Sequence, residues 1–383
     1  MMAYVLFFTC FGFILYTYVI YPCILAIWAV GRHRKIQGTI HYETPSVSVL
    51  ISAYNEEGVI LHRIKNLAET NYPTEKIEFL IGSDGSTDKT NEILSSCKLP
   101  NLRPIIFHQR SGKASVLNSL IPAANGEIIV FSDANTFFQT DTIKKIVECF
   151  ADPSVGAVCG NLQFISDLRT TGGYAEGTYW HYENLVKKLE SDVHTTIGAT
   201  GAVYAIRKEL FRPLPLNNVV MDDFLIPLFV VQRGYRIVYR PDAMAFEKLS
   251  NSVVGEFRRK VRIGAANFYG ISYFASLLHP RHGFVAFALW SHKIIRWFVP
   301  FLLICVFLMT VLLAAHSDFF YAIFIAEILF IGMAIFGFAL DRLKLSVGVL
   351  GLPYYFLTVN VALFAGFIKY LFDKQKATWE IIR

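Results

Sequence analysis

The sequence predicts an α/β domain with a mixed, mostly parallel sheet, flanked by transmembrane helices. Apolar runs of strand length alternate with polar stretches of helical length between residues 40 and 275, and long apolar segments lie on both sides of that region. Such alternation is typical of βαβ units, in which helices cover both faces of a parallel sheet. The flanking segments are long enough to cross a hydrocarbon core of about 30 Å.

The composition fits a membrane protein better than a soluble enzyme. Of the 383 residues, 54% are hydrophobic and 17% are charged, and the mean hydropathy is +0.42. The net charge of +6 comes without a long basic block, which indicates a face towards anionic lipid or phosphate rather than a nucleic-acid partner. The six cysteines include no C-x-x-C pair, so we expect small core residues in a reducing compartment.

Residues 1–30 are predicted to form an N-terminal transmembrane anchor that is not cleaved. The stretch 4–30 has no charged side chain, exceeds a signal-peptide core of about 7–15 residues, and is not followed by a small-residue cleavage site. The basic run Gly31-Arg-His-Arg-Lys35 comes next. The positive-inside rule therefore places the following domain in the cytoplasm and the N-terminus outside.

Residues 40–275 are predicted to form this cytosolic domain. Ligands of open α/β sheets bind beyond the carboxyl ends of the strands. Asp84 and Asp133 fall at two such ends, so we expect them at a binding site, and the alternative is that they only cap the next helix. The predicted strands are Val47–Ser52, Ile77–Ile81, Leu102–His108 and Glu127–Phe131, followed by helices from Glu56, Asp88, Gly112 and Thr140.

Three apolar segments predict a C-terminal transmembrane region over residues 298–372, followed by a tail over 373–383. The third segment contains Gly348, Gly351 and Pro353, so it can cross, kink or re-enter the bilayer. Three crossings would leave the basic tail outside, against the positive-inside rule, and the sequence leaves this open. Residues 268–297 mix aromatic and basic side chains, which predicts an interfacial amphipathic segment.

Two oxygen-bearing side chains, Asp133 and Asn135, follow the fourth predicted strand. In an extended turn they point the same way and could face a hard cation such as Mg²⁺ or Mn²⁺. Asn135 is a neutral and weaker ligand, so water and a nucleotide diphosphate would have to complete the coordination. The alternative is a turn that binds no metal.

Asp222 and Asp223 begin a further predicted helix. One of them could act as a general base on an acceptor hydroxyl, although the helix dipole alone would also favour both carboxylates. Arg259 and Arg262 lie three residues apart on one helical face. They could neutralise a departing nucleotide diphosphate, or the helix could rest on anionic lipid.

The segment Ser52–Glu56 ends the first predicted strand, where small polar groups could hold a base and ribose, or could form a plain turn. Asp84 precedes a glycine and could accept a hydrogen bond from a uracil or ribose donor. The sequence contains no G-x-x-x-x-G-K-[ST], no G-x-G-x-x-G after a strand and no H-E-x-x-H. These absences argue against an ATPase, a dinucleotide oxidoreductase and a zinc protease.

Taken in order, these motifs resemble those of the membrane-bound family 2 glycosyltransferases. That group includes cellulose, hyaluronan and poly-N-acetylglucosamine synthases and ceramide glucosyltransferase. The resemblance covers roughly residues 45–270 and implies a GT-A-like fold and a metal-dependent inverting hexosyltransferase. The matching segments are Val47–Glu57, Asp84–Asp88, Gly112–Asn118, Asp133–Asn135, Thr200-Gly201 and Asp222-Asp223.

The resemblance also implies roles for individual residues. Asp223 would be the catalytic base beside Asp222, and Thr200 and Gly201 would lie beside the acceptor. Asp133 and Asn135 would hold the metal. The residues implied to bind the nucleotide sugar are Asn55, Glu56, Asp84, Lys113, Asp133, Arg259 and Arg262.

Arg259 and Ile263 depart from the Q-x-x-R-W pattern of the family, in which the Trp stacks beneath the acceptor sugar of polysaccharide synthases. We expect transfer from a UDP-sugar to a growing polysaccharide. The alternatives are transfer of one sugar to a lipid carrier or glycolipid, and a non-catalytic nucleotide-binding scaffold. The partners expected are the donor, the acceptor and membrane lipids, with a second copy or an export protein as a further candidate. The protein is expected in the bacterial inner membrane.

Overall fold

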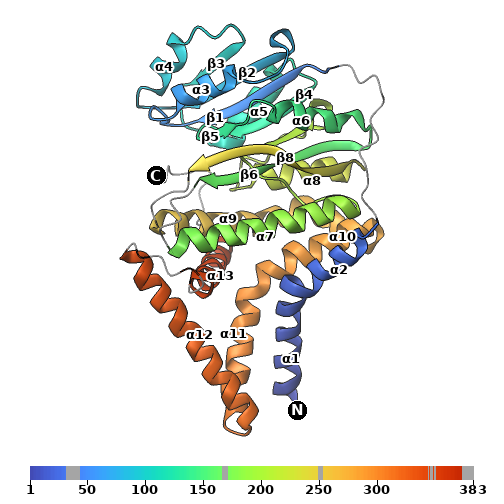
Figure 1. Cartoon of the computed structure of the whole chain (residues 1–383), viewed down its shortest axis with the longest axis vertical. Helices are drawn as coiled ribbons and strands as arrows, with labels where there is room; N and C mark the ends of the chain where they lie inside the picture. The colour runs from blue at the N-terminus through green and yellow to red at the C-terminus, as the bar shows by residue number, and fades with distance from the viewer. Residues whose placement is uncertain are drawn as a thin grey trace.

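A computed structural model describes residues 1–31, 44–165, 171–248, 253–343, 345, 348 and 351–372. It contains a mixed sheet, a layer of long helices beneath that sheet, and apolar helices that extend away from this layer (Figure 1). The strands are β1 Val47–Ala53, β2 Ile77–Asp84, β3 Leu102–Phe107, β4 Ile128–Asp133, β5 Thr136–Phe138, β6 Val155–Ile165, β7 Tyr204–Arg207 and β8 Arg236–Lys248.

The sheet has eight strands in the order β3-β2-β1-β4-β7-β6-β8-β5. β3, β2, β1 and β4 are parallel, β7 is antiparallel to both of its neighbours, and β6 is parallel to β8. β5 closes one edge antiparallel to β8. The predicted fold class, a mixed and mostly parallel sheet with helices on both faces, is confirmed.

Strand residues alternate between two hydrophobic cores, because successive side chains of a strand point to opposite faces. Val49 and Ile51 of β1 face one core, which is closed by α3 and α6. Leu50 faces the other core, which is closed by α5 and α8 and continues to the apolar helices through Tyr21 and Leu25. The second core therefore joins the domain to the N-terminal helix.

The helices of the domain begin close to the predicted positions. Each of the four expected helices starts one to four residues later than expected, because a loop separates it from its strand. The described part of the domain contains the helices α3 Ile60–Ala68, α4 Thr90–Ser96, α5 Lys113–Ala123, α6 Thr142–Glu148, α7 Thr171–Val193, α8 Asp222–Gln232 and α9 Val253–Phe274. Short 3₁₀ turns lie at Thr74–Lys76, Cys149–Ala151, Lys208–Leu210, Ala275–Leu278 and Pro280–His282.

Four helices of the described chain are long and apolar enough to cross a membrane: Met2–Ala29, Phe284–Ala314, Asp318–Arg342 and Gly351–Leu371. The first joins α1 Met2–Leu15 and α2 Tyr21–Ala29 through the π-helical turn η1 Tyr16–Ile20. The second joins α10 Phe284–Ala288 and α11 Ile295–Ala314 through the π-helical turn η7 Leu289–Ile294. The last two are α12 Asp318–Arg342 and α13 Gly351–Leu371.

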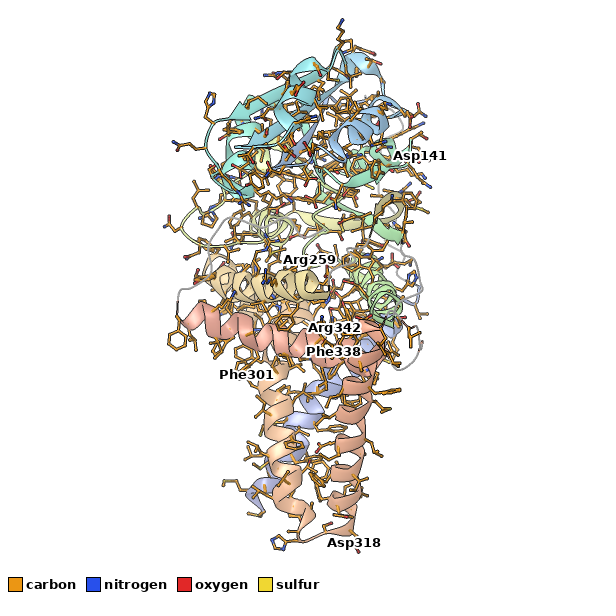
Figure 2. The ribbon with its side chains drawn as sticks, turned by 90° about the vertical axis from the view of Figure 1, so that its left-hand side faces the viewer. Asp141, Arg259, Phe301, Asp318, Phe338 and Arg342 are labelled. Atoms are coloured by element: carbon orange, nitrogen blue, oxygen red, sulfur yellow. The ribbon has the colours of Figure 1, made fainter. Side chains whose placement is uncertain are left out.

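α12 starts at Asp318, at the end of the molecule far from the domain, and reaches Arg342 close to it (Figure 2). α13 instead runs across the direction of α11 and α12 in both views and lies directly beneath the domain (Figures 1 and 2). It packs against α9 so closely that a Cβ at Gly366 would lie 2.6 Å from the Val261 carbonyl oxygen. The helix is apolar enough to span a membrane, but it lies at a large angle to α11 and α12 (Figure 2).

Candidate active site

Asp84 ends β2 as predicted, fully buried. Its carboxylate accepts hydrogen bonds from the backbone N–H groups of Ser111 and Gly112, at 2.7 and 2.9 Å. Gly85 has a φ of 66°, and a Cβ there would lie 2.7 Å from the Arg110 backbone nitrogen. In this structure Asp84 therefore fixes the loop that leads into α5, and any contact with a nucleotide would be additional.

Asn55 and Glu56 form the loop after β1, facing the segment after β2. The Thr87 N–H donates to the Asn55 side-chain oxygen at 2.8 Å, and the Glu56 N–H donates to the Thr90 hydroxyl at 2.7 Å. Beside them the Arg110 guanidinium lies 3.7 Å from the centre of the Tyr54 ring. These planar groups offer a surface on which a nucleobase could stack. Sequence reasoning missed Arg110, which has no motif of its own.

Lys113 connects two of the predicted acidic groups. Its Nζ lies 2.8 Å from Asp133 Oδ1 and 3.3 Å from Asp222 Oδ1. Burial opposes its charge, but the neighbouring carboxylates outweigh burial and raise the pKa of Lys113. The first residue of α5, the last of β4 and the first of α8 thus meet at one point, as the resemblance implied.

Asp222 and Asp223 have different surroundings. Asp222 accepts from the Tyr204 hydroxyl at 3.0 Å through Oδ2, while Oδ1 faces Lys113. Asp223 accepts from the Gly201 N–H at 2.9 Å through Oδ2. Burial and the adjacent Asp222 raise the pKa of Asp223 to about 6. Asp223 Oδ1 accepts no hydrogen bond from the residues that the structure describes, and this raised pKa suits a base near neutral pH.

The predicted acceptor segment supports this base. A Cβ at Gly201 would lie 3.1 Å from Asp223 Oδ2, so glycine permits the close approach of backbone and carboxylate. Thr200 is buried and its hydroxyl accepts from Lys187 Nζ at 2.8 Å. Lys187 lies on α7 and was not predicted from the sequence.

Asp133 and Asn135 flank the turn between β4 and β5. The Asn135 amide donates to Glu247 at 2.8 Å, which leaves the amide oxygen of Asn135 available. Burial and the nearby Asp133 raise the pKa of Glu247 to about 7. In the described part of the chain no three His, Cys, Asp or Glu side chains form a ready metal site. The oxygen donors fit Mg²⁺ or Mn²⁺ if a diphosphate and water supply the remaining ligands.

The two predicted arginines of α9 differ. Arg259 forms ion pairs with Glu256 at 2.9 Å and with Glu176 of α7 at 3.4 Å, and so helps to clamp α7 to α9. Arg262 makes no hydrogen bond or ion pair with the residues that the structure describes. Burial and Arg259 lower its pKa, while Asp222 and the other site carboxylates oppose that shift. Arg262 is therefore the arginine that remains free to meet a diphosphate.

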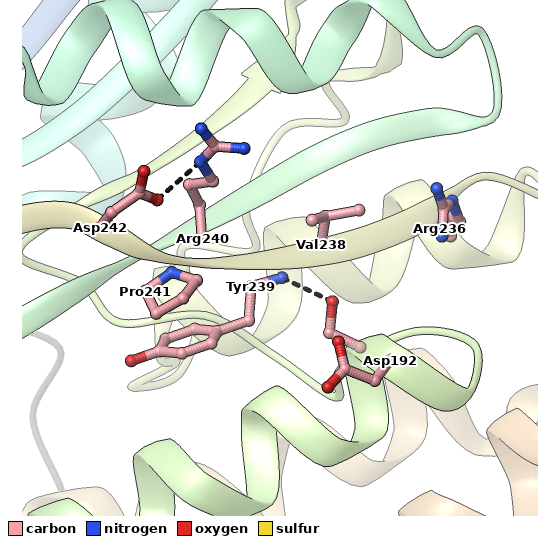
Figure 3. Close-up of a pocket in the computed structure, with 8 residues that line it drawn as sticks. Asp192, Arg236, Val238, Tyr239, Arg240, Pro241 and Asp242 are labelled. Atoms are coloured by element: carbon pink, nitrogen blue, oxygen red, sulfur yellow. Dashed lines mark hydrogen bonds and ion pairs between the residues drawn. The ribbon is translucent and has the colours of Figure 1, made fainter. Parts of the chain in front are cut away.

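A hollow of about 290 Å³ lies elsewhere, between β8 and the end of α7 (Figure 3). Its charged groups are already paired: Arg240 with Asp242 at 2.7 Å, and Arg236 with Asp152 at 2.9 Å. It contains none of the predicted site residues, so we do not assign it a ligand.

Comparisons with known proteins show what this chain is similar to. Residues 48–214 match the model of glycosyl transferase family 2. A poly-β-1,6-N-acetyl-D-glucosamine synthase from Staphylococcus aureus is 26% identical over 271 residues, which are 66% of this chain and 64% of the relative. A β-monoglucosyldiacylglycerol synthase from Nostoc is 38% identical over 144 residues, 35% of this chain and 31% of that protein. The match thus spans less than two thirds of these curated relatives.

Among solved structures, a mannosyltransferase from Pyrobaculum calidifontis in complex with GDP-Man and Mn²⁺ superposes with a TM-score of 0.73 at 24% identity. The superposition covers 97% of this chain and 99% of the other, and it shows a shared fold. The fold is GT-A-like, with apolar helices flanking the domain. Over residues 48–214 the chain is therefore similar to the proteins of glycosyl transferase family 2.

Proposed function

We propose that the chain is an inverting glycosyltransferase that moves a sugar from a UDP-sugar to an acceptor hydroxyl at the membrane. The observation that carries the proposal is the convergence of one lysine and three carboxylates from β4, α5 and α8. The members of this cluster are Lys113, Asp133, Asp222 and Asp223. The similarity to glycosyl transferase family 2 supports glycosyl transfer as the reaction class.

Asp223 would take the proton from the acceptor hydroxyl with its free oxygen, while the Gly201 N–H holds the other oxygen. The hydroxyl oxygen then bonds to the anomeric carbon, and the bond from that carbon to the diphosphate oxygen breaks on the opposite face. The electron pair leaves with the diphosphate, whose charge Arg262 and Lys113 would stabilise. A single displacement of this kind inverts the anomeric centre.

Asp133 and Asn135 would hold a divalent cation, Mg²⁺ or Mn²⁺. When bound, the cation would neutralise charge on the nucleotide diphosphate. Glu247 lies beside Asn135 and would orient its amide, so that the amide oxygen faces the cation.

A growing polysaccharide is the first candidate acceptor, because one group of relatives is named as polysaccharide synthases. A lipid is the second candidate. It is favoured by the similarity to a glycolipid synthase and by α13, which lies beneath the domain where an exported chain would have to leave. A lipid acceptor needs only a cleft at the membrane surface.

The direction of α13 also suggests a topology. If the helices ending at Ala29 and Ala314 and α12 cross while α13 stays at the interface, the chain returns to the side of the domain. That arrangement would keep the basic tail on the cytoplasmic side, as the positive-inside rule prefers. It is the reading we propose for a protein of the bacterial inner membrane.

Product analysis in nanodiscs with radiolabelled nucleotide sugars tests the proposal. We expect release of the free nucleotide with a β-linked product from an α-linked donor, and a polymer or a single glycolipid then identifies the acceptor. Asp223→Asn should abolish transfer, by about 10³-fold or more, and leave nucleotide binding intact. Full activity in Asp223→Asn, or retention at the anomeric carbon, would contradict the mechanism.

A further inference from the structure

A cluster of buried charges joins the membrane helices to the domain, well outside the groups used above. Glu190 of α7 and His292 of η7 are both fully buried. Glu190 Oε1 lies 2.7 Å from His292 Nδ1 and also accepts from the Tyr21 hydroxyl at 2.7 Å. Glu183 precedes Glu190 by seven residues on the same face of α7. Its Oε2 lies 3.1 Å from His292 Nε2, and it forms an ion pair with Arg296.

The cluster sits where two irregular helices meet. The Thr17 hydroxyl of η1 donates to the Ser291 carbonyl of η7, and the Tyr16 hydroxyl lies 2.7 Å from Ser291 Oγ. The Tyr182 hydroxyl of α7 donates to the Tyr18 carbonyl at 2.9 Å. π-Helical turns displace backbone groups from the regular ladder and are frequent at functional sites. Here both turns face α7, which separates them from the sheet (Figure 1).

The two oxygens of Glu190 serve opposite sides of α7. Oε1 faces Tyr21 and His292 of the membrane helices, whereas Oε2 accepts from the Thr196 hydroxyl and the Ile197 N–H, both at 3.1 Å. One carboxylate therefore connects the membrane helices directly to the loop after α7.

That loop holds the proposed base. Its Ala199 N–H donates to the Asp223 carbonyl at 2.8 Å, and its Gly201 N–H donates to the Asp223 carboxylate at 2.9 Å. Lys187, also on α7, donates to the Thr200 hydroxyl at 2.8 Å. α7 thus fixes the loop at two points. Glu190 accepts hydrogen bonds near the start of the loop, and Lys187 holds Thr200, next to Gly201.

Holding α7 against the apolar helices does not by itself require buried charged groups. Hydrophobic residues of similar volume hold two elements together at least as well as a buried ion pair, because desolvating the charges is costly. Charged hydrogen bonds do impose direction and distance. The cluster is therefore suited to defining where the loop sits relative to the membrane helices.

We propose that Glu190, held by His292 and Tyr21, is a positioning residue that sets the base Asp223 relative to the membrane through the 195–201 loop. The role rests on the proposed function of Asp223. It makes the membrane helices part of the machinery that aligns the base with an acceptor at the membrane surface.

Hydrogen exchange of the 195–201 amides tests the positioning without any substrate. In the 383-residue chain in nanodiscs, Glu190→Gln keeps the shape of the side chain but loses its charge, so exchange of these amides should rise about tenfold or more. Tyr21→Phe removes one hydrogen bond and should give a smaller rise. Asp152→Asn is the matched control, because it breaks the buried Asp152–Arg236 pair outside this cluster.

Kinetics provide the second readout. Glu190→Gln should lower kcat about 100-fold with little change in the KM of the donor, since the base and not the donor pocket is displaced. The Gly201 N–H lowers the pKa of Asp223 in the wild type. If Glu190→Gln displaces the loop, this hydrogen bond weakens, the pKa of Asp223 rises, and the acidic limb of the pH profile moves to higher pH. Asp152→Asn should change neither kcat nor the limb.

The inference is overturned if the wild type is active and Glu190→Gln leaves loop exchange and the acidic limb unchanged. It is also overturned if Asp152→Asn alters both as strongly, since the effect would then be general destabilisation. A wild type that fails to transfer any sugar removes the proposed function instead, and the kinetic role of Glu190 with it.

Discussion

The edge of the sheet that carries Asp84 and the helical layer beneath the sheet hold their carboxylates in different ways. At the edge, Asp84 is held by backbone N–H groups of Ser111 and Gly112. In the layer, Glu176 is held by Lys260 at 3.0 Å and Glu183 by Arg296. Backbone donors come from nearby turns, whereas side-chain cations come from distant helices. Asp84 is therefore held by the loop that leads into α5, while Asp133 and Asp222 of the same edge share the Lys113 cation. The helical layer is a tertiary assembly of distant helices that lies between the sheet and the apolar helices (Figure 1).

The cation site at the edge should give the largest loss. Asp133→Ala removes the carboxylate that faces Lys113 and the proposed cation, so kcat/KM should fall about 10³-fold. Mn²⁺ binding in the presence of the nucleotide, followed by electron paramagnetic resonance, should weaken in parallel. Unchanged Mn²⁺ binding would show that Asp133 is not a ligand. Asp141→Ala, whose carboxylate pairs with Lys145, is the control and should change neither quantity.

Gly201→Ala tests how closely the loop and the base are matched. The added Cβ would lie 3.1 Å from Asp223 Oδ2, so the carboxylate must shift by a few tenths of an ångström. We expect kcat to fall about tenfold to 100-fold with donor affinity unchanged, because a small misplacement of a base is costly. Equal kcat values for the wild type and Gly201→Ala would mean that the contact between Gly201 and Asp223 does not control the position of the base.

The pH dependence reports the base itself. Asp223 must be ionised to accept a proton, and burial raises its pKa to about 6. Activity is therefore retained above this pKa, and kcat/KM should fall about tenfold per pH unit below it. A profile that stays flat down to pH 5 would remove Asp223 as the base.

Substitutions of the two arginines of α9 should have different kinetic effects. Arg262→Gln should lower kcat/KM about tenfold to 100-fold, since Arg262 is free to stabilise the departing diphosphate. Arg259→Gln breaks a partly exposed pair with Glu256 and Glu176, so we expect a smaller kinetic effect and a modest loss of thermal stability. Equal kinetic losses would indicate that both arginines contact the donor.

Sequence patterns predicted the edge better than the layer. β1 to β4 are rich in apolar residues, so each begins within one residue and ends within three residues of the predicted position. β8 was missed because polar and charged residues and Pro241 interrupt its pattern, and β7 has only four residues. A strand that polar residues interrupt, or one of only four residues, carries a weak periodic signal.

The site was predicted only in part. Asp133, Lys113 and the Asp222–Asp223 pair converge as the motifs implied. Lys187 and Glu247 were missed, because each acts through contacts with residues far away in sequence. The α7–α9 clamp that occupies Arg259 had no local signal either, since Glu176 is a single acidic residue on a helix.

The coupling of Lys113 to Asp223 tests the central claim most directly, because only convergence of α5 and α8 allows it. Lys113 lowers the pKa of Asp223 in the folded protein. In Lys113→Met the acidic limb of kcat/KM should therefore move to higher pH, while Lys145→Met, whose lysine pairs with Asp141, should leave it in place. An acidic limb that does not move in Lys113→Met would contradict a single shared transfer site.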